Sequence, residues 1–152
     1  MNGLTEEEGK RLEEISAQIE ERRAIAEFLR RQISALGDAV GSIGATVEAL
    51  RRMKEVQPGT EILVPVGPET FVPARSEKQD KVLVGVGADV VVEKPIDDAI
   101  KFLEERSDEL QRAMTSIGAE AMKVEEQLEK LIPERDALLG KAMKESEGGS
   151  GA

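Results

Sequence analysis

Apolar residues in the first third of the chain recur with alternating steps of three and four positions. One row is Leu12, Ile19, Ala26, Ile33, Val40 and Val47, and the other is Ile15, Arg22, Leu29, Leu36, Ile43 and Leu50. Arg22 is the single polar member. A 3.5-residue period held over six heptads is typical of a coiled-coil seam. We therefore predict a helix over residues 5–54, capped by Thr5 and Glu8.

The last third of the chain repeats this pattern. Its rows are Ile100, Ser107, Met114, Ala121, Leu128, Arg135 and Ala142, and Ile96, Leu103, Leu110, Ile117, Val124, Leu131 and Leu138. Pro95 suits a first helical position, where its missing N–H costs nothing. We predict a second helix over residues 95–144 and a flexible Gly-rich tail over 145–152. Two seams of matched length predict an antiparallel two-helix coiled coil within one chain.

The middle segment, residues 58–94, has a different pattern. Its four prolines exclude a continuous helix, and its apolar residues form short β-branched runs. Glycines follow two of these runs, at Gly67 and Gly87, where tight turns would fall. The segment therefore predicts two β-hairpins.

These hairpins carry apolar residues on both faces. Side chains alternate between the two faces of a strand, so Val82 and Val84 lie on one face, while Leu83 and Val91 make the other face apolar too. Short strands with two apolar faces and open edges need further strands to cover them. We predict that other chains do so, and that oligomerisation uses Ile62, Val64, Phe71, Val82, Val84, Val90 and Val92.

Composition narrows the chemistry. The chain has no Cys and no His, which removes thiolate sites and the commonest general base. Gly85-Val86-Gly87 lacks the lysine and the helix start of a phosphate loop. No catalytic constellation appears, so we expect no enzyme, no cofactor and no metal site.

The charge of the chain bears on its partners. A net charge of −10 disfavours nucleic acid and anionic membrane surfaces. No signal peptide is evident, and no stretch approaches the roughly 18 apolar residues of a membrane helix. We expect a cytoplasmic protein.

The hairpin sequences resemble a known family. Glu61-Ile62-Leu63-Val64-Pro65-Val66-Gly67 followed by Phe71-Val72, and Val82-Leu83-Val84-Gly85-Val86-Gly87 followed by Val90-Val91-Val92, are similar to the hairpins of archaeal-type prefoldin α subunits. Asp97-Asp98-Ala99-Ile100 continues into the second helix as in that family. The resemblance implies a mainly α fold, in which an antiparallel two-helix coiled coil carries a central pair of β-hairpins that form an oligomeric β-barrel.

The resemblance also implies partners and a role. The implied assembly is a hetero-hexamer of two α and four prefoldin β subunits. In its implied role, this hexamer captures unfolded proteins at the coiled-coil tips without ATP and delivers them to a group II chaperonin. The alternative from the residues alone is a structural spacer or scaffold with a β oligomerisation module. Apolar residues off the heptad rows near the tip favour the chaperone.

Candidate client-binding residues lie where the first helix begins and the second ends. They are Leu4, Leu12, Ile15, Leu131, Ile132, Leu138, Leu139 and Met143. Those on the heptad rows could instead close the seam. The off-row residues Leu4, Ile132, Leu139 and Met143 are expected to be exposed, and Leu and Met adapt to varied sequences.

Three further features have structural interpretations. Pro133 should break or kink the second helix. Arg22 and Arg135 should pack their stems in the seam and reach Glu side chains with their heads. Glycines at 37, 41 and 44 each cost a helix about 1 kcal/mol relative to alanine. Close helix contact and local bending explain these glycines equally well.

Overall fold

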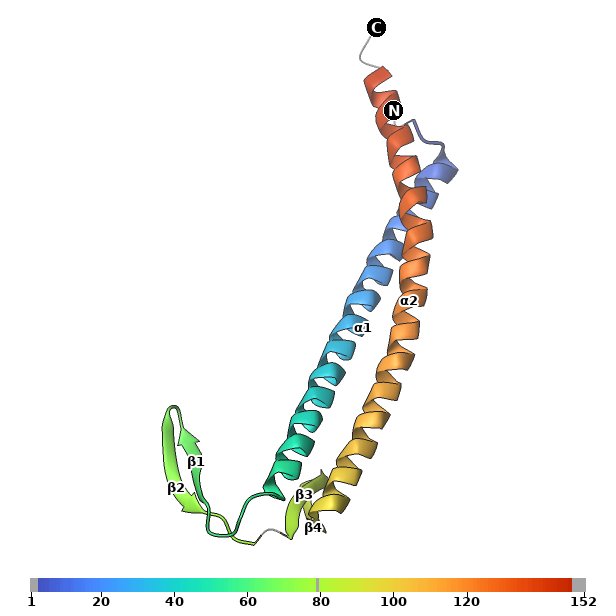
Figure 1. Ribbon diagram of the computed structural model, residues 1–152. Helices are drawn as coiled ribbons and strands as arrows, with labels where there is room; N and C mark the ends of the chain where they lie inside the picture. The colour runs from blue at the N-terminus through green and yellow to red at the C-terminus, as the bar shows by residue number, and fades with distance from the viewer. Residues whose placement is uncertain (1–2, 79, 149–152) are drawn as a thin grey trace. The chain divides into compact units, whose positions relative to one another are not determined.

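The computed structural model describes residues 3–78 and 80–148 and contains two long helices and four strands (Figure 1). The elements are α1 (Glu6–Met53), β1 (Glu61–Gly67), β2 (Thr70–Arg75), β3 (Lys81–Gly87), β4 (Val90–Pro95) and α2 (Ile96–Gly148). Strand β1 pairs only with β2, and β3 only with β4, within the described residues. The predicted mainly α fold with two antiparallel hairpins is confirmed. The barrel would require several chains and stays a prediction.

The chain divides into two compact units, which are described separately. The helical unit contains residues up to Leu36 and from Ala113 onward, and the hairpin unit spans Gly37–Arg112. Each unit therefore holds one part of α1 and one part of α2.

The helical unit is an antiparallel helix pair closed by its heptad rows. Ile15, Ile19, Ala26 and Leu29 are buried, as a seam requires. Thr5 caps α1: its N–H donates to Glu8 Oε2 (2.9 Å), and the Glu8 N–H donates to Thr5 Oγ1 (3.2 Å). The predicted capping box is confirmed.

The two arginines in the seam find acidic neighbours on their own helices. Arg22 Nη1 lies 3.7 Å from Glu21 Oε2, and Arg135 Nη2 lies 3.1 Å from Asp136 Oδ1. The prediction that the heads reach Glu holds for Arg22, whereas Arg135 reaches Asp. Arg22 Nε is buried and has no hydrogen-bond partner among the described residues.

Of the two predicted outcomes at Pro133, the break is wrong, because α2 continues through Pro133 to Gly148, while the kink stays a prediction. Proline removes one N–H and crowds the carbonyl four residues earlier, on Glu129. Pro133 and Glu129 are both exposed, so water can satisfy the freed carbonyl, while the seam residues Leu131 and Leu138 on either side are half-buried. Of the predicted tail, residues 145–148 are helical and 149–152 lie outside the described residues.

The two hairpins are the same structural unit repeated after 20 residues. Val64 pairs with Val72 in the first and Val84 with Val92 in the second. Both registers shift at the same place, between Pro65 and Gly67 and between Gly85 and Gly87. Gly87 has φ +111°, a left-handed conformation that favours glycine.

The core of the hairpin unit joins the second hairpin to the helices. Its buried members are Val47, Leu50, Val84, Ile96, Ala99 and Ile100, with Ile43, Val82, Phe102 and Leu103 packed around them. Arg51 Nη2 binds Glu104 Oε1 at 2.7 Å, and Lys54 binds Asp97. In contrast, the first hairpin is exposed along both strands except at half-buried Ala74.

Of the α1 glycines singled out from the sequence, Gly41 and Gly44 have open space beside them. A Cβ added at Gly41 or Gly44 would meet no heavy atom within 4 Å. Within this chain, close helix contact therefore does not explain either residue.

One stretch of α1 is long and apolar enough to cross a membrane, judged by length and composition alone. This differs from the sequence expectation. Between Ile33 and Leu50 the only charged residues are Asp38 and Glu48, and small residues fill most of the off-row positions. Only 11% of this stretch is buried within the chain, and Val47 and Leu50 are its members in the hairpin-unit core.

Candidate functional site

The predicted client-binding residues differ in how much surface they offer. Leu139 is 42% exposed and Met143 is 66% exposed, as predicted for off-row positions. Leu4 and Ile132, also off the rows, are half-buried. On the rows, Ile15 is fully buried, whereas Leu12, Leu131 and Leu138 are half-buried. Ile15 therefore belongs to the seam, and the two exposed members of the predicted set, Leu139 and Met143, both lie on α2.

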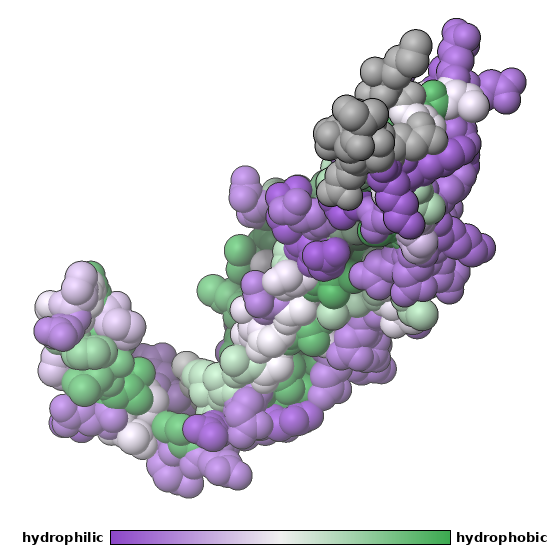
Figure 2. Space-filling model, turned by 90° about the horizontal axis from the view of Figure 1, so that it is seen from above, coloured by the Kyte–Doolittle hydropathy of each residue, from purple (hydrophilic) through white to green (hydrophobic). Residues whose placement is uncertain are grey.

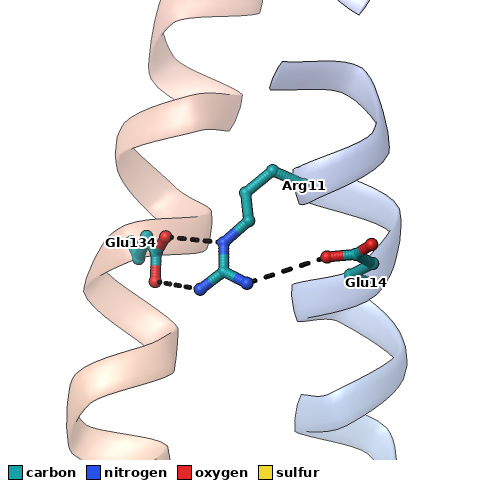
Figure 3. A network of polar contacts seen from close by, with 3 residues as sticks. All are labelled: Arg11, Glu14 and Glu134. Atoms are coloured by element: carbon teal, nitrogen blue, oxygen red, sulfur yellow. Dashed lines mark hydrogen bonds and ion pairs between the residues drawn. The ribbon is translucent and has the colours of Figure 1, made fainter. Parts of the chain in front are cut away.

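A charged clasp joins the two helices at this end. The Arg11 guanidinium donates to both carboxylate oxygens of Glu134, through Nε at 2.9 Å and Nη2 at 3.1 Å. Arg11 Nη1 also lies 3.8 Å from Glu14 on its own helix, and Figure 3 shows Arg11 between the two carboxylates. Lys141 Nζ donates to Glu8 Oε1 at 2.6 Å. These pairs form across the register that α1 and α2 adopt in the helical unit.

The clasp lowers the pKa of its carboxyl groups. The hydrogen bond from Lys141 lowers the pKa of Glu8, and the N-cap bond with Thr5 adds to this. The hydrogen bond from Arg11 lowers the pKa of Glu134. An open depression of about 450 Å³ lies beside the clasp, lined by Thr5, Glu7, Glu8, Arg11, Glu134, Ala137 and Leu138. The sequence analysis did not predict the clasp, although Arg11 and Glu134 have opposite charges and each stands next to a seam row.

The predicted oligomerisation residues are mostly on the surface. Ile62, Val64, Phe71, Val90 and Val92 are exposed, and Val82 is half-buried. Val84 is only 8% exposed, because it packs against the helices in the hairpin-unit core. Its side chain is thus already covered within the chain.

Other exposed residues on the hairpins were not among the predicted contacts. Leu83 is 75% exposed, and Leu63, Val66, Val72, Val86 and Val91 are also exposed. Figure 2 shows hydrophobic side chains reaching the surface of the β1–β2 hairpin, at the left of the view. The sequence indicated this exposure, because Leu83 and Val91 lie on the opposite strand face from the predicted contacts Val82 and Val84.

The register places apolar residues on both faces of the first hairpin. Leu63 pairs with Pro73 and Pro65 with Phe71, so these four share one face. The other face holds Ile62, Val64, Val72 and Ala74. Neither face is buried within this chain. The described residues also hold no group of three or more His, Cys, Asp or Glu that could bind a metal.

Comparison with known proteins identifies the family. The family described as prefoldin subunit matches residues 23–141, more than three quarters of the chain. The chain belongs to the prefoldin family. Prefoldin subunit alpha of Thermofilum pendens is 36% identical over 86 residues, 57% of this chain and 67% of that protein. Prefoldin subunit alpha of Pyrococcus horikoshii is 33% identical over 108 residues, 69% of this chain and 72% of that protein.

A solved structure agrees with this assignment. The chain superposes on a cryo-EM structure of filamentous PFD from Methanocaldococcus jannaschii with a TM-score of 0.70 and 26% identity. The match covers 77% of this chain and 97% of that one. The archaeal relatives, which are named prefoldin subunit alpha, confirm the predicted α type. Prefoldin subunits are chaperone subunits that assemble with one another into a complex.

Proposed function

We propose that this chain is a subunit of an ATP-independent holdase, which captures non-native proteins at the coiled-coil tips and passes them to a group II chaperonin in the cytoplasm. The observation that carries the proposal is the exposed apolar surface of Leu139 and Met143 beside the charged clasp of a prefoldin α-type chain. A pure spacer has no need of such surface at the end of its helices.

The hairpins support assembly with partners. Their apolar faces and open edges would be covered by prefoldin β subunits, in a hetero-hexamer of two α and four β chains built around a β-barrel. Each exposed Val or Leu that becomes fully buried contributes roughly 1.5–3 kcal/mol. Leu63, Leu83 and Val91 are among the residues with the most to gain.

Weak contacts at single tips suffice for a holdase. One or two apolar side chains bind any one client segment weakly, and several tips in one assembly raise the effective concentration of the others. Release then needs no nucleotide, because each contact breaks readily by itself. Such binding also explains how one protein accepts unrelated sequences.

The test is aggregation of a chemically denatured client without nucleotide. The Leu139→Ser/Met143→Ser variant should lose most of the protection that the parent gives. The matched control is Ile25→Ser/Phe28→Ser, which removes two exposed apolar side chains farther along α1 in the same unit. Equal protection by the parent and the tip variant would move client binding away from the tips.

A second candidate is a scaffold built by repeated pairing of the hairpins. The solved structure of filamentous PFD favours it, because a chain of the same fold forms a filament there. Sedimentation and electron microscopy of the chain alone distinguish the two functions. Filaments that do not protect a denatured client would favour the scaffold.

A further inference from the structure

The seam divides the tip of the helical unit into two flanks. The first rows are those that begin with Leu12 and Ile100, and the second rows begin with Ile15 and Ile96. In an antiparallel pair, residues one position after a second-row residue face one another across one side of the seam, and residues one position before a first-row residue face one another across the other side. Arg11 and Glu134 hold preceding positions on their helices, and they pair at 2.9 Å. In the hairpin unit, Arg51 and Glu104 hold following positions, and they pair at 2.7 Å. The flank with Arg11 and Glu134 is thus identified by a contact at the tip itself, and the other flank follows from the heptad rule that Arg51 and Glu104 obey in the hairpin unit.

We name one flank the acidic apolar flank. It is formed by the residues directly after the second rows and, farther from the seam, by the residues directly after the first rows. Ile132, Leu139 and Met143 lie on its α2 side, and the α1 positions facing them are Gly9 and Ser16. Gly9 is half-buried, yet a Cβ there would meet no atom within 4 Å. Small residues on α1 thus leave the apolar side chains of α2 accessible.

Acidic side chains border this flank on both helices. Glu6, Glu13 and Glu20 follow one another at seven-residue intervals along α1, and all three are exposed. Glu129 and Asp136 stand on the α2 side, and Asp136 binds Arg135 of the seam. Over residues 5–20 and 129–144, no Lys or Arg occupies a position on this flank.

The opposite flank is electrically mixed. It carries Arg11 and Lys141 of the clasp together with Lys130 and Lys144, beside acids such as Glu14. The net acidity of the tip is therefore concentrated on the flank that also exposes apolar side chains.

We propose that the acidic apolar flank selects client segments in which apolar side chains alternate with Lys or Arg. This inference rests on the proposed function and specifies its substrate class. Apolar client side chains would pack on Leu139, Met143 and Ile132, while client cations would pair with the glutamates along α1. Exposed pairs are individually weak, so several together give selectivity rather than tight binding.

The experiment measures binding of two labelled peptides of equal length and leucine content to the full-length protein as purified. One peptide carries Lys between the leucines, and the other carries Glu. At low salt the Lys peptide should bind about tenfold more tightly, as expected for a few exposed ion pairs, and the difference should shrink with added salt.

Charge reversal identifies the flank. In Glu13→Lys/Glu20→Lys the preference for the Lys peptide should be lost or reversed. The matched control, Glu7→Lys/Glu120→Lys, makes the same change in net charge at two exposed positions on the opposite flank and should keep the preference. Circular dichroism checks that both variants remain helical.

The outcomes separate this inference from the function on which it rests. Equal binding of the two peptides, or equal loss in both variants, overturns the inference if the parent still protects a denatured client. Protection without binding of either peptide overturns it as well. A parent that protects no client overturns the proposed function itself.

Discussion

Replacement of Gly41 and Gly44 by alanine should stabilise the protein. Both residues lie in the interior of α1, and neither has an atom within 4 Å of the position that a Cβ would take. Alanine costs about 1 kcal/mol less than glycine in a helix interior, because glycine loses more backbone freedom on folding. The double variant should therefore gain about 2 kcal/mol.

Thermal unfolding followed by helical circular dichroism is the assay. For a chain of this length, 1 kcal/mol corresponds to a change in Tm of roughly 2–4 °C, so the double variant should melt about 4–8 °C higher. Gly87→Ala is the control with the opposite sign, because φ +111° at that residue strains any side chain. An unchanged or lower Tm in the double variant would refute the reasoning. It would show that these glycines serve helix bending or contact with another chain.

Three further predictions concern the seam, the clasp and the hairpins. Arg22→Leu should stabilise the helical unit by about 1–3 kcal/mol, measured by denaturant unfolding, because it removes a buried donor that lacks a partner. The pKa values of Glu8 and Glu134 are lowered in the folded protein, so their ion pairs stabilise it above pH 4.5, the ordinary pKa of a Glu side chain. This stabilisation is lost as the pH falls through the pKa values of the folded state, and a Tm that rises on acidification would contradict it. Leu83→Asp/Val91→Asp should reduce the mass measured by light scattering while helical circular dichroism persists, and an unchanged mass would exclude this hairpin face from assembly.

The helices and hairpins were predictable because their signals are local. A seam needs apolar side chains every three to four residues, and Ile15, Ile19 and Leu29 are buried where the rows placed them. The hairpins follow from β-branched runs with glycine at the turns. These patterns depend on neighbouring residues alone, so the sequence carries them in full.

The clasp and the cover on Val84 were not predictable in the same way. A heptad seam remains apolar when one helix slides by seven residues, so the rows do not determine that Arg11 meets Glu134. Likewise, alternation gives Val82 and Val84 a common face but does not say whether helices of this chain or another chain cover it. Pro133 shows the same limit, since packing on both sides keeps α2 helical despite a local preference to break.

The two hairpins share one register but differ in where proline interrupts the N–H donors along their edges. Proline can stand in a paired strand where its missing N–H would point away from the partner strand. Pro65 and Pro73 thus each remove one outward donor from the first copy, whereas the equivalent Gly85 and Glu93 keep theirs. In the second hairpin Pro95 removes one such donor from β4, whereas β3 contains no proline and keeps a complete row. Among the four described strands, the edge of β3 alone has no proline to interrupt its outward N–H groups, so an incoming chain can distinguish it from the other three.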